Sequence, residues 1–302
     1  MTRRTLLGAL ATLGLTAAGG RAGMAAVDFL KRPIPATGEM VPVIGMGSWI
    51  TFDVGSDPTR RAVRAEVLRT FFGAGGTVID SSPMYGTSEA VIGWCLGRLG
   101  GERAPFAATK VWTPGRWLGQ EQMRHSRDLW GVPRFDLMQV HNLVDWQTHL
   151  ETLIAMKEAG EIRYIGVTTS HGRRHGELAL VMQELPIDFV QFSYNIVDRA
   201  AERRLLPLAA DRGLAVIINR PFRRGALFDR FRHHPLPGWA EEFDAANWAQ
   251  FFLKFIVSHP AVTCAIPATS RVDHMQENMG ALTGRLPDAK MRARMARHVA
   301  EL

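Results

Sequence analysis

The strongest constraint on the fold is a repeated alternation of short apolar segments with stretches of helical periodicity. Apolar segments of strand length lie at residues 43–49, 77–80, 106–111, 137–141, 164–167, 189–192, 215–219 and 263–267. Helical periodicity follows at 60–73, 88–97, 120–130, 146–159, 174–185, 202–212, 245–257 and 272–282. Strands that alternate with helices pair in parallel, because each helix returns the chain to the same edge of the sheet. Eight such units predict an α/β fold, a closed (β/α)8 TIM barrel.

Two segments fall outside this repeat. Residues 28–42 contain prolines and a Gly-Glu pair before the first strand, and we expect a hairpin there that closes the bottom of the barrel. Residues 223–239 follow the seventh strand and are long and irregular, which indicates a functional loop. The sequence has no internal repeat of fixed period, and no linker divides the chain.

The first 26 residues are typical of an export signal. Arg3 and Arg4 precede an apolar run of 13 residues at 6–18, which is shorter than the ~20 residues that a membrane span needs. The pattern resembles a twin-arginine signal, and the alternative is a basic N-terminus with a buried helix. We therefore expect residues 1–26 to be a signal peptide and 27–302 to be one barrel. The protein would be periplasmic and touch the membrane only transiently, or cytoplasmic if these residues are no signal.

Charge and cysteine content exclude other classes. The net charge of +7 falls to +4 without the three arginines of the first segment, and no basic cluster indicates nucleic-acid binding. Two cysteines exclude a disulfide-rich fold and a cysteine-rich metal module. His171 and His175 are four residues apart but are separated by a glycine and two arginines with no acid between them, so we expect no metal site.

Titratable residues stand at the ends of neighbouring predicted strands: Asp80, Tyr85 just beyond it, Lys110 and His141. The carboxyl ends of parallel barrel strands face the active site. The chain uses Lys for only 5 of its 36 cationic residues, and a lysine within a buried strand needs a partner, which Asp80 would supply. Taken singly, Asp80 could equally be a turn cap and His141 a core histidine.

Together these four residues favour proton transfer to a carbonyl oxygen. We expect Lys110 to lower the pKa of the Tyr85 phenol from its free value of ~10, so that Tyr85 can donate a proton. His141 would orient the substrate oxygen. No Ser or Cys nucleophile accompanies them, so the hydride of a carbonyl reduction would come from a nicotinamide.

The segments that carry these four residues resemble a known enzyme family. GTVIDSSPMYGTSEAVIGWCLG, FAATKVW and DLMQVHNLVD resemble the Asp-and-Tyr, Lys and His blocks of the aldo-keto reductase family, and GEIRYIGVTTS, FVQFSYN, NRPFRRGAL and AIPATSRVDHMQEN match further blocks in order. The resemblance implies a catalytic tetrad of Asp80, Tyr85, Lys110 and His141. It also implies a substrate pocket with Trp49, Trp112 and, where many members have Trp, Asn142.

The resemblance also implies the cofactor contacts. Thr168-Thr169 stands at the family's Ser-Asn pair, and Asn219 replaces the tyrosine that stacks on nicotinamide. Ala268 replaces the lysine that binds the 2′-phosphate, although nearby residues could still hold that group. The implied cofactor-binding set is Thr168, Thr169, Gln191, Asn219, Arg220, Arg223, Arg224, Thr269, Ser270, Arg271, Glu277 and Asn278. We expect NADPH, with NADH possible.

The sequence therefore predicts an exported NAD(P)H-dependent reductase of a small aldehyde or ketone, acting as a monomer. One alternative is a regulatory or sensor barrel that binds the nucleotide with little turnover. Another is a metal-dependent hydrolase, which the lack of a His/carboxylate cluster at two strand ends disfavours.

Overall fold

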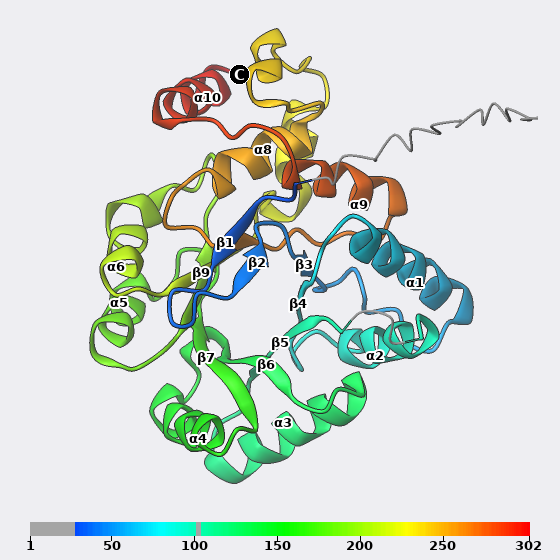
Figure 1. The fold of residues 1–302 in the computed structure, drawn as a ribbon, viewed down its shortest axis with the longest axis vertical. Coiled ribbons are helices and arrows are strands. Elements are labelled where there is room, and N and C mark those ends of the chain that lie inside the picture. The colour runs from blue at the N-terminus through cyan, green and yellow to red at the C-terminus, as the bar shows by residue number, and fades with distance from the viewer. Residues whose placement is uncertain (1–27, 101–103) are drawn as a thin grey trace, which may run out of the picture.

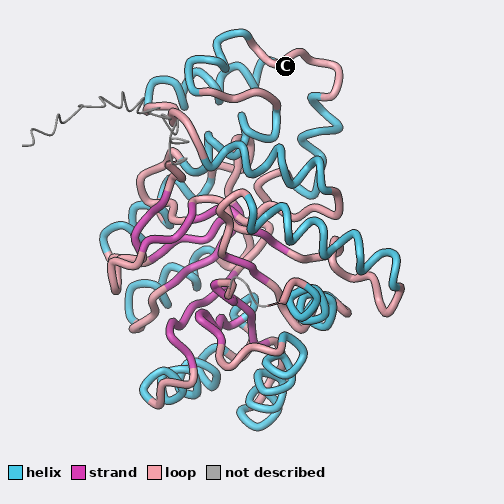
Figure 2. Tube along the Cα trace, turned by 45° about the vertical axis from the view of Figure 1, so that its right-hand side comes forward, coloured by secondary structure: helices cyan, strands magenta, loops and turns pink. Residues whose placement is uncertain are grey.

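The computed structural model describes residues 28–100 and 104–302, so the predicted signal peptide at 1–26 lies outside the described residues. Its centre is an eight-stranded sheet in the order β3-β4-β5-β6-β7-β8-β9-β10, with every neighbouring pair parallel. The helices form a ring outside these strands (Figure 1), and Figure 2 shows the strands as the inner layer. The predicted (β/α)8 barrel is confirmed.

The strands are short and almost fully buried, as expected for apolar segments covered on both faces. The barrel strands are β3 (Met46–Gly47), β4 (Val78–Asp80), β5 (Phe106–Val111), β6 (Phe135–Val140), β7 (Ile162–Thr168), β8 (Phe189–Ser193), β9 (Ala215–Asn219) and β10 (Cys264–Ala265). The predicted segments at 43–49 and 263–267 are therefore longer than the regular strands they contain.

Two glycines let the first strand close the barrel. Gly45 N–H donates to the Ala265 carbonyl at 2.9 Å, and Gly47 N–H donates to the Pro267 carbonyl at 3.0 Å. A Cβ on Gly45 would lie 2.8 Å from the Val78 carbonyl oxygen, and one on Gly47 would lie 2.9 Å from that of Ile266. Both distances are too short for a side chain, so closure at this seam requires glycine.

The predicted N-terminal hairpin is present as β1 (Lys31–Pro33) paired antiparallel with β2 (Met40–Pro42). Ile34 and Val41 from this hairpin are buried in one cluster with interior barrel residues such as Phe106 and Phe189. The Thr37 hydroxyl lies 2.8 Å from the hydroxyl of Tyr164 on β7. The hairpin thus closes the end of the barrel opposite the carboxyl ends of the strands.

The helices match the predicted periodic stretches, with two additions. They are α1 (Pro58–Gly73), α2 (Ser88–Arg98), α3 (Arg116–Trp130), α4 (Trp146–Glu158), α5 (His175–Glu184), α6 (Leu205–Asp211), α7 (Ala226–Phe231), α8 (Trp248–Val257), α9 (Val272–Met279) and α10 (Ala289–Glu301). Short 3-10 helices lie at His141–Leu143, Ala200–Arg203, Arg223–Gly225, Gly238–Phe243 and Gly280–Leu282.

The two additions are α7 and α10. The predicted loop at 223–239 is not irregular throughout, because α7 lies within it and packs Leu227 and Phe231 into the core. The last helix, α10, begins where the Asp288 carboxylate accepts the Met291 N–H at 2.8 Å, which is a helix cap. None of the helices in the described part of the chain is long and apolar enough to cross a membrane.

Candidate active site

A cavity of about 540 Å³ opens at the carboxyl ends of the barrel strands. Asp80, Tyr85 and His141 line it. Lys110 lies beneath them and is fully buried. The four residues predicted from the strand ends therefore come together at one site, on β4, the turn after it, β5 and the residue that follows β6.

Lys110 is held by two oxygen atoms inside the barrel. Its Nζ lies 2.5 Å from Asp80 Oδ2 and 2.7 Å from the Ser81 carbonyl oxygen. Burial lowers the pKa of Lys110, while the Asp80 and Glu89 carboxylates oppose that shift. The lysine thus has the acidic partner that the sequence indicated.

The second oxygen of Asp80 is bound by two amides. Asp80 Oδ1 accepts hydrogen bonds from Gln139 Nε2 and Gln191 Nε2, each at 3.0 Å. Gln191 Nε2 also donates to Gln139 Oε1 at 3.1 Å. Gln139 was not among the predicted site residues, although a polar residue two positions before His141 on a buried strand places both side chains on the barrel interior.

Tyr85 lies in the turn between β4 and α2, facing His141. The two rings meet edge to face with centroids 5.6 Å apart, and Lys110 Nζ lies 5.2 Å from the Tyr85 ring centroid. Burial raises the pKa of Tyr85 well above its ordinary value, and the Asp80 charge adds to that shift. The expectation that the pKa of Tyr85 is lowered is therefore wrong, because Asp80 balances the charge of Lys110 and the phenolate would be poorly solvated. Tyr85 is a neutral hydroxyl donor at neutral pH.

His141 is a neutral imidazole at this site. Burial lowers its pKa well below the ordinary value, and the nearby Lys110 charge lowers it further. Its Nδ1 lies 2.8 Å from Ser82 Oγ. The site thus presents two uncharged polar groups, a phenol and an imidazole, to one cavity, which suits hydrogen bonding and proton transfer to an oxygen atom.

Many of the predicted cofactor residues line the same cavity. They are Thr168, Thr169, Gln191, Asn219, Arg220, Arg224, Thr269, Ser270 and Arg271, with the predicted pocket residues Trp49 and Asn142. Asn219 Nδ2 donates to Gln191 Oε1 at 3.2 Å and to the Thr169 carbonyl at 3.0 Å. The cavity extends from the Asp80 network to the loops after β7, β9 and β10.

Two polar atoms in this lining fit a bound dinucleotide. Thr169 Oγ1 and Arg220 Nη1 are buried and have no hydrogen-bond partner among the described residues. Such atoms are normally satisfied in native proteins. A carboxamide or ribose near Thr169 and a phosphate near Arg220 would satisfy them, so the residues fit a nicotinamide dinucleotide.

The loop after β9 is held in an unusual conformation. Arg220, Arg223 and Arg224 have φ angles of +53°, +50° and +62°, which residues other than glycine rarely adopt and which cluster at ligand-binding sites. The Arg224 guanidinium lies 4.5 Å from the Trp49 ring centroid, so it spans from this loop to the segment after β3.

Besides the buried Lys110, four predicted site residues do not line the cavity. Trp112 is 42% exposed, and its backbone N–H donates to Gln122 Oε1 on α3 at 2.6 Å. Arg223 pairs with Asp198 at 3.1 Å. Glu277 and Asn278 lie on α9 outside the lining.

Several lining residues were not predicted: Met84, His171, Phe222, Phe228 and His274. Phe222 and Phe228 lie in and beside the loop after β9, with ring centroids 4.7 Å apart. A signal was present, since apolar residues flank the arginines there, but sequence spacing alone does not show which of them face a ligand.

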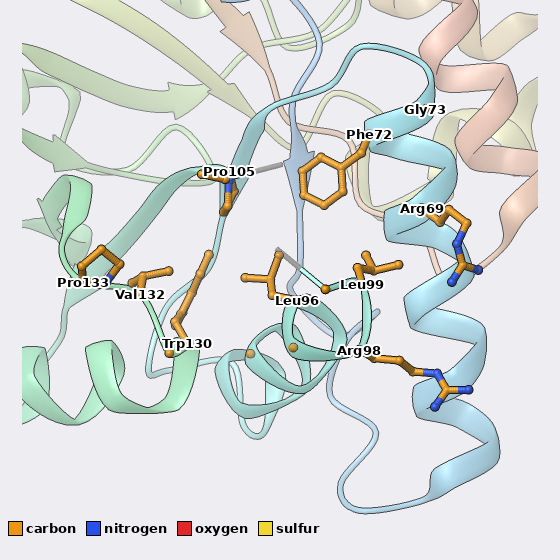
Figure 3. Close-up of a pocket in the computed structure, with 15 residues that line it drawn as sticks. Arg69, Phe72, Gly73, Leu96, Arg98, Leu99, Pro105, Trp130, Val132 and Pro133 are labelled. Carbon is orange, nitrogen blue, oxygen red and sulfur yellow. The ribbon is translucent and has the colours of Figure 1, made fainter. Parts of the chain in front are cut away.

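A second cavity of about 730 Å³ lies outside the barrel, between the ends of α1, α2 and α3 (Figure 3). Phe72, Leu96 and Trp130 face it, and Arg69 and Arg98 stand along one edge. Its lining comes from the C-terminal ends of these three helices and from Pro105 just before β5, so it lies away from the carboxyl ends of the strands. We assign it no part in the chemistry.

The fold and this site define a (β/α)8-barrel enzyme with its polar residues at the carboxyl ends of the strands. A family model, described as "Aldo/keto reductase family", matches residues 43–297. The chain therefore belongs to the aldo/keto reductase family and is an NAD(P)H-dependent oxidoreductase.

Individual proteins are more distantly similar. The chain is 28% identical over 269 residues to aldo-keto reductase str7 of Strobilurus tenacellus, covering 76% of this chain and 79% of that protein. It is 26% identical over 250 residues to the NADH-specific methylglyoxal reductase of Escherichia coli, covering 70% and 72%. A crystal structure of an aldo/keto reductase from Klebsiella pneumoniae with NADP and acetate superposes with a TM-score of 0.73 at 24% identity, covering 87% of this chain and 93% of that one.

Proposed function

We propose that this protein reduces a small aldehyde or ketone to the alcohol, with Tyr85 as the proton donor. The observation that carries the proposal is the neutral Tyr85 phenol beside neutral His141, above the buried Lys110–Asp80 pair. A nicotinamide held by the residues of this cavity would supply the hydride for the carbonyl carbon. Tyr85 transfers its proton to the carbonyl oxygen, while His141 donates a hydrogen bond that orients that oxygen.

We propose NADPH as the preferred cofactor, with NADH also accepted. Arg220, Arg224 and Arg271 line the cavity, and Asp80, which Lys110 neutralises, is the one acidic residue in its described lining. Such a surface favours the extra phosphate of NADPH. The similar proteins differ in this respect, since the Klebsiella structure holds NADP and the Escherichia coli relative is NADH-specific.

We propose a small carbonyl compound as the substrate. The cavity of about 540 Å³ must hold the nicotinamide end of the cofactor as well, which leaves limited room. Trp49, Met84 and Phe228 supply apolar surface beside Tyr85. The Escherichia coli relative is named a methylglyoxal reductase, which supports a short aldehyde.

The test is NADPH oxidation by the purified protein with a panel of short aldehydes and ketones. We expect steady-state turnover that depends on both the carbonyl compound and the enzyme concentration. A protein that binds the dinucleotide in a 1:1 ratio, yet reduces none of the panel, would instead be a nucleotide-binding sensor.

We also propose that the protein is exported to the periplasm and acts there as a monomer. Arg3 and Arg4 before a short apolar run support export by the twin-arginine route. Replacement of both by lysine should leave the protein in the cytoplasmic fraction, and unchanged export would remove this proposal. Light scattering of the purified protein tests the monomer.

A further inference from the structure

Ser82 lies in the same turn as Tyr85, and its side chain contacts the ring of His141. It is fully buried. Its Oγ lies 2.8 Å from His141 Nδ1, and the backbone N–H of Met84 donates to the same Oγ at 3.2 Å. The hydroxyl oxygen therefore already accepts one hydrogen bond, and its own hydrogen remains for a second partner.

One hydrogen-bond arrangement gives the hydrogen of the Ser82 hydroxyl an acceptor, and that arrangement has Ser82 as the donor to His141. If His141 Nδ1 carried a hydrogen, Ser82 Oγ would accept twice, and its own hydrogen would be buried without an acceptor. No other acceptor for this hydroxyl is found among residues 28–100 and 104–302. An unsatisfied buried donor is costly, so Ser82 donates to Nδ1. Neutral imidazole carries one hydrogen, which then lies on Nε2.

We propose that Ser82 is a positioning residue that holds His141 in the Nε2–H tautomer, so that the ring presents a donor to the substrate oxygen. The inference rests on the proposed carbonyl reduction. The opposite tautomer would present a lone pair of Nε2 to the lone pairs of the carbonyl oxygen, and that contact is repulsive. Ser82 itself does not touch the substrate, because it acts through the imidazole.

The charged groups around His141 keep its ring neutral, so the tautomer determines which nitrogen can donate a hydrogen bond. Lys110 on β5 lowers the pKa of the imidazole, the Asp80 carboxylate is bound to that lysine, and Tyr85 contributes an uncharged ring. The imidazole is therefore neutral over the working pH range, and a neutral ring donates from only one nitrogen. A hydroxyl that donates to Nδ1 also stabilises the neutral form, because imidazolium has no acceptor there.

The matched pair of variants is Ser82→Ala and Ser81→Ala. The two serines are adjacent and fully buried, but Ser81 Oγ is bonded to Ser48 Oγ at 2.8 Å and not to the histidine. Nitrogen-15 NMR of the histidine side chains distinguishes the two tautomers and follows the pKa, with the His141 signals identified by their loss in His141→Asn. We expect Ser82→Ala to populate both tautomers and to raise the pKa of His141, and Ser81→Ala to change neither.

Kinetics supply the second measurement. For Ser82→Ala we expect kcat/KM to fall by about 2–10-fold, the effect of one neutral hydrogen bond, with the acid limb of the pH profile moved to higher pH and the Kd of NADPH unchanged. Ser82→Cys, a weaker donor of similar shape, should lie between Ser82→Ala and the unmodified protein. Unchanged tautomer and pKa in Ser82→Ala would overturn the proposal. The NMR measurement needs no turnover, so an inactive enzyme would refute the proposed reduction and leave this inference to be decided separately.

Discussion

Lys110 Nζ and Asp80 Oδ2 form a buried ion pair at 2.5 Å, with side chains 0% and 2% exposed. The pair places a balanced charge directly below Tyr85. Because Asp80 also accepts two amide hydrogen bonds from Gln139 and Gln191, the carboxylate is satisfied and fixed. These residues therefore form a rigid polar floor of the cavity, and the net charge of this floor is close to zero.

Removal of one partner from this pair should destabilise the fold. Lys110→Met leaves the Asp80 carboxylate buried without a cation, at a cost of roughly 3–5 kcal/mol in the free energy of unfolding. Asp80→Asn combined with Lys110→Met should recover part of that loss, because no unpaired charge remains. Urea denaturation of the two variants measures both values, and equal stability of the single and double variants would contradict this explanation.

A control for this loss is available elsewhere in the chain. Lys254 on α8 is also fully buried, and its Nζ donates to the carbonyls of Phe243 and Thr283 at 2.8 and 2.9 Å, away from the cavity. Lys254→Met should lower stability and leave the turnover of the folded fraction unaltered. Lys110→Met should lower both. Equal turnover in the two variants would show that Lys110 does not contribute to the reaction.

The pH dependence of reduction should show a broad plateau. Reduction needs protonated Tyr85, whose pKa is raised, so activity is lost only as pH rises above the ordinary phenol value of ~10. It also needs neutral His141, whose pKa is lowered, so activity on the acid side is lost only well below ~6.5. Single-turnover rates of NADPH oxidation across pH measure this profile, and an alkaline limb near neutral pH would contradict it.

Arg271 should distinguish the two cofactors. It is exposed and pairs with Asp273, and only NADPH carries the extra phosphate that this guanidinium could contact. Arg271→Ala should raise the Kd of NADPH by about 2–5-fold, the effect of an exposed charge pair, with little effect on NADH. Asp273→Asn should lower the Kd of NADPH, because the guanidinium of Arg271 is then free to bind the phosphate. Calorimetric titration gives both constants, and equal weakening of the two cofactors would show that Arg271 does not contact the phosphate.

The fold was predictable because it depends on patterns that are local in sequence. Eight apolar segments separated by helical periodicity determine parallel pairing, and the structure confirms the barrel and the hairpin at residues 28–42. Strand lengths at 43–49 and 263–267 were overestimated, because much of each segment only approaches its neighbour at the closing seam. Helix α7 was missed, because loop composition around its six residues conceals a single buried apolar face.

The sequence predicted those site residues whose positions are determined by the ends of the strands. Asp80 and Lys110 were expected to pair, and they do. The pKa of Tyr85 was not predictable, because its direction depends on how burial, Asp80 and Lys110 balance in space. Trp112 follows its strand as expected, yet its side chain is exposed, and sequence spacing does not determine a rotamer.

Proton donation by Tyr85 is the central claim, and Tyr85→Phe tests it most directly. The change deletes one hydroxyl and preserves the ring, so the Kd of NADPH should be unaltered. The single-turnover rate of NADPH oxidation with a reducible aldehyde at neutral pH should fall by ~10²–10⁴-fold, the usual contribution of a positioned general acid. A rate close to that of the unmodified enzyme would contradict the claim and make His141 the leading candidate for the proton donor.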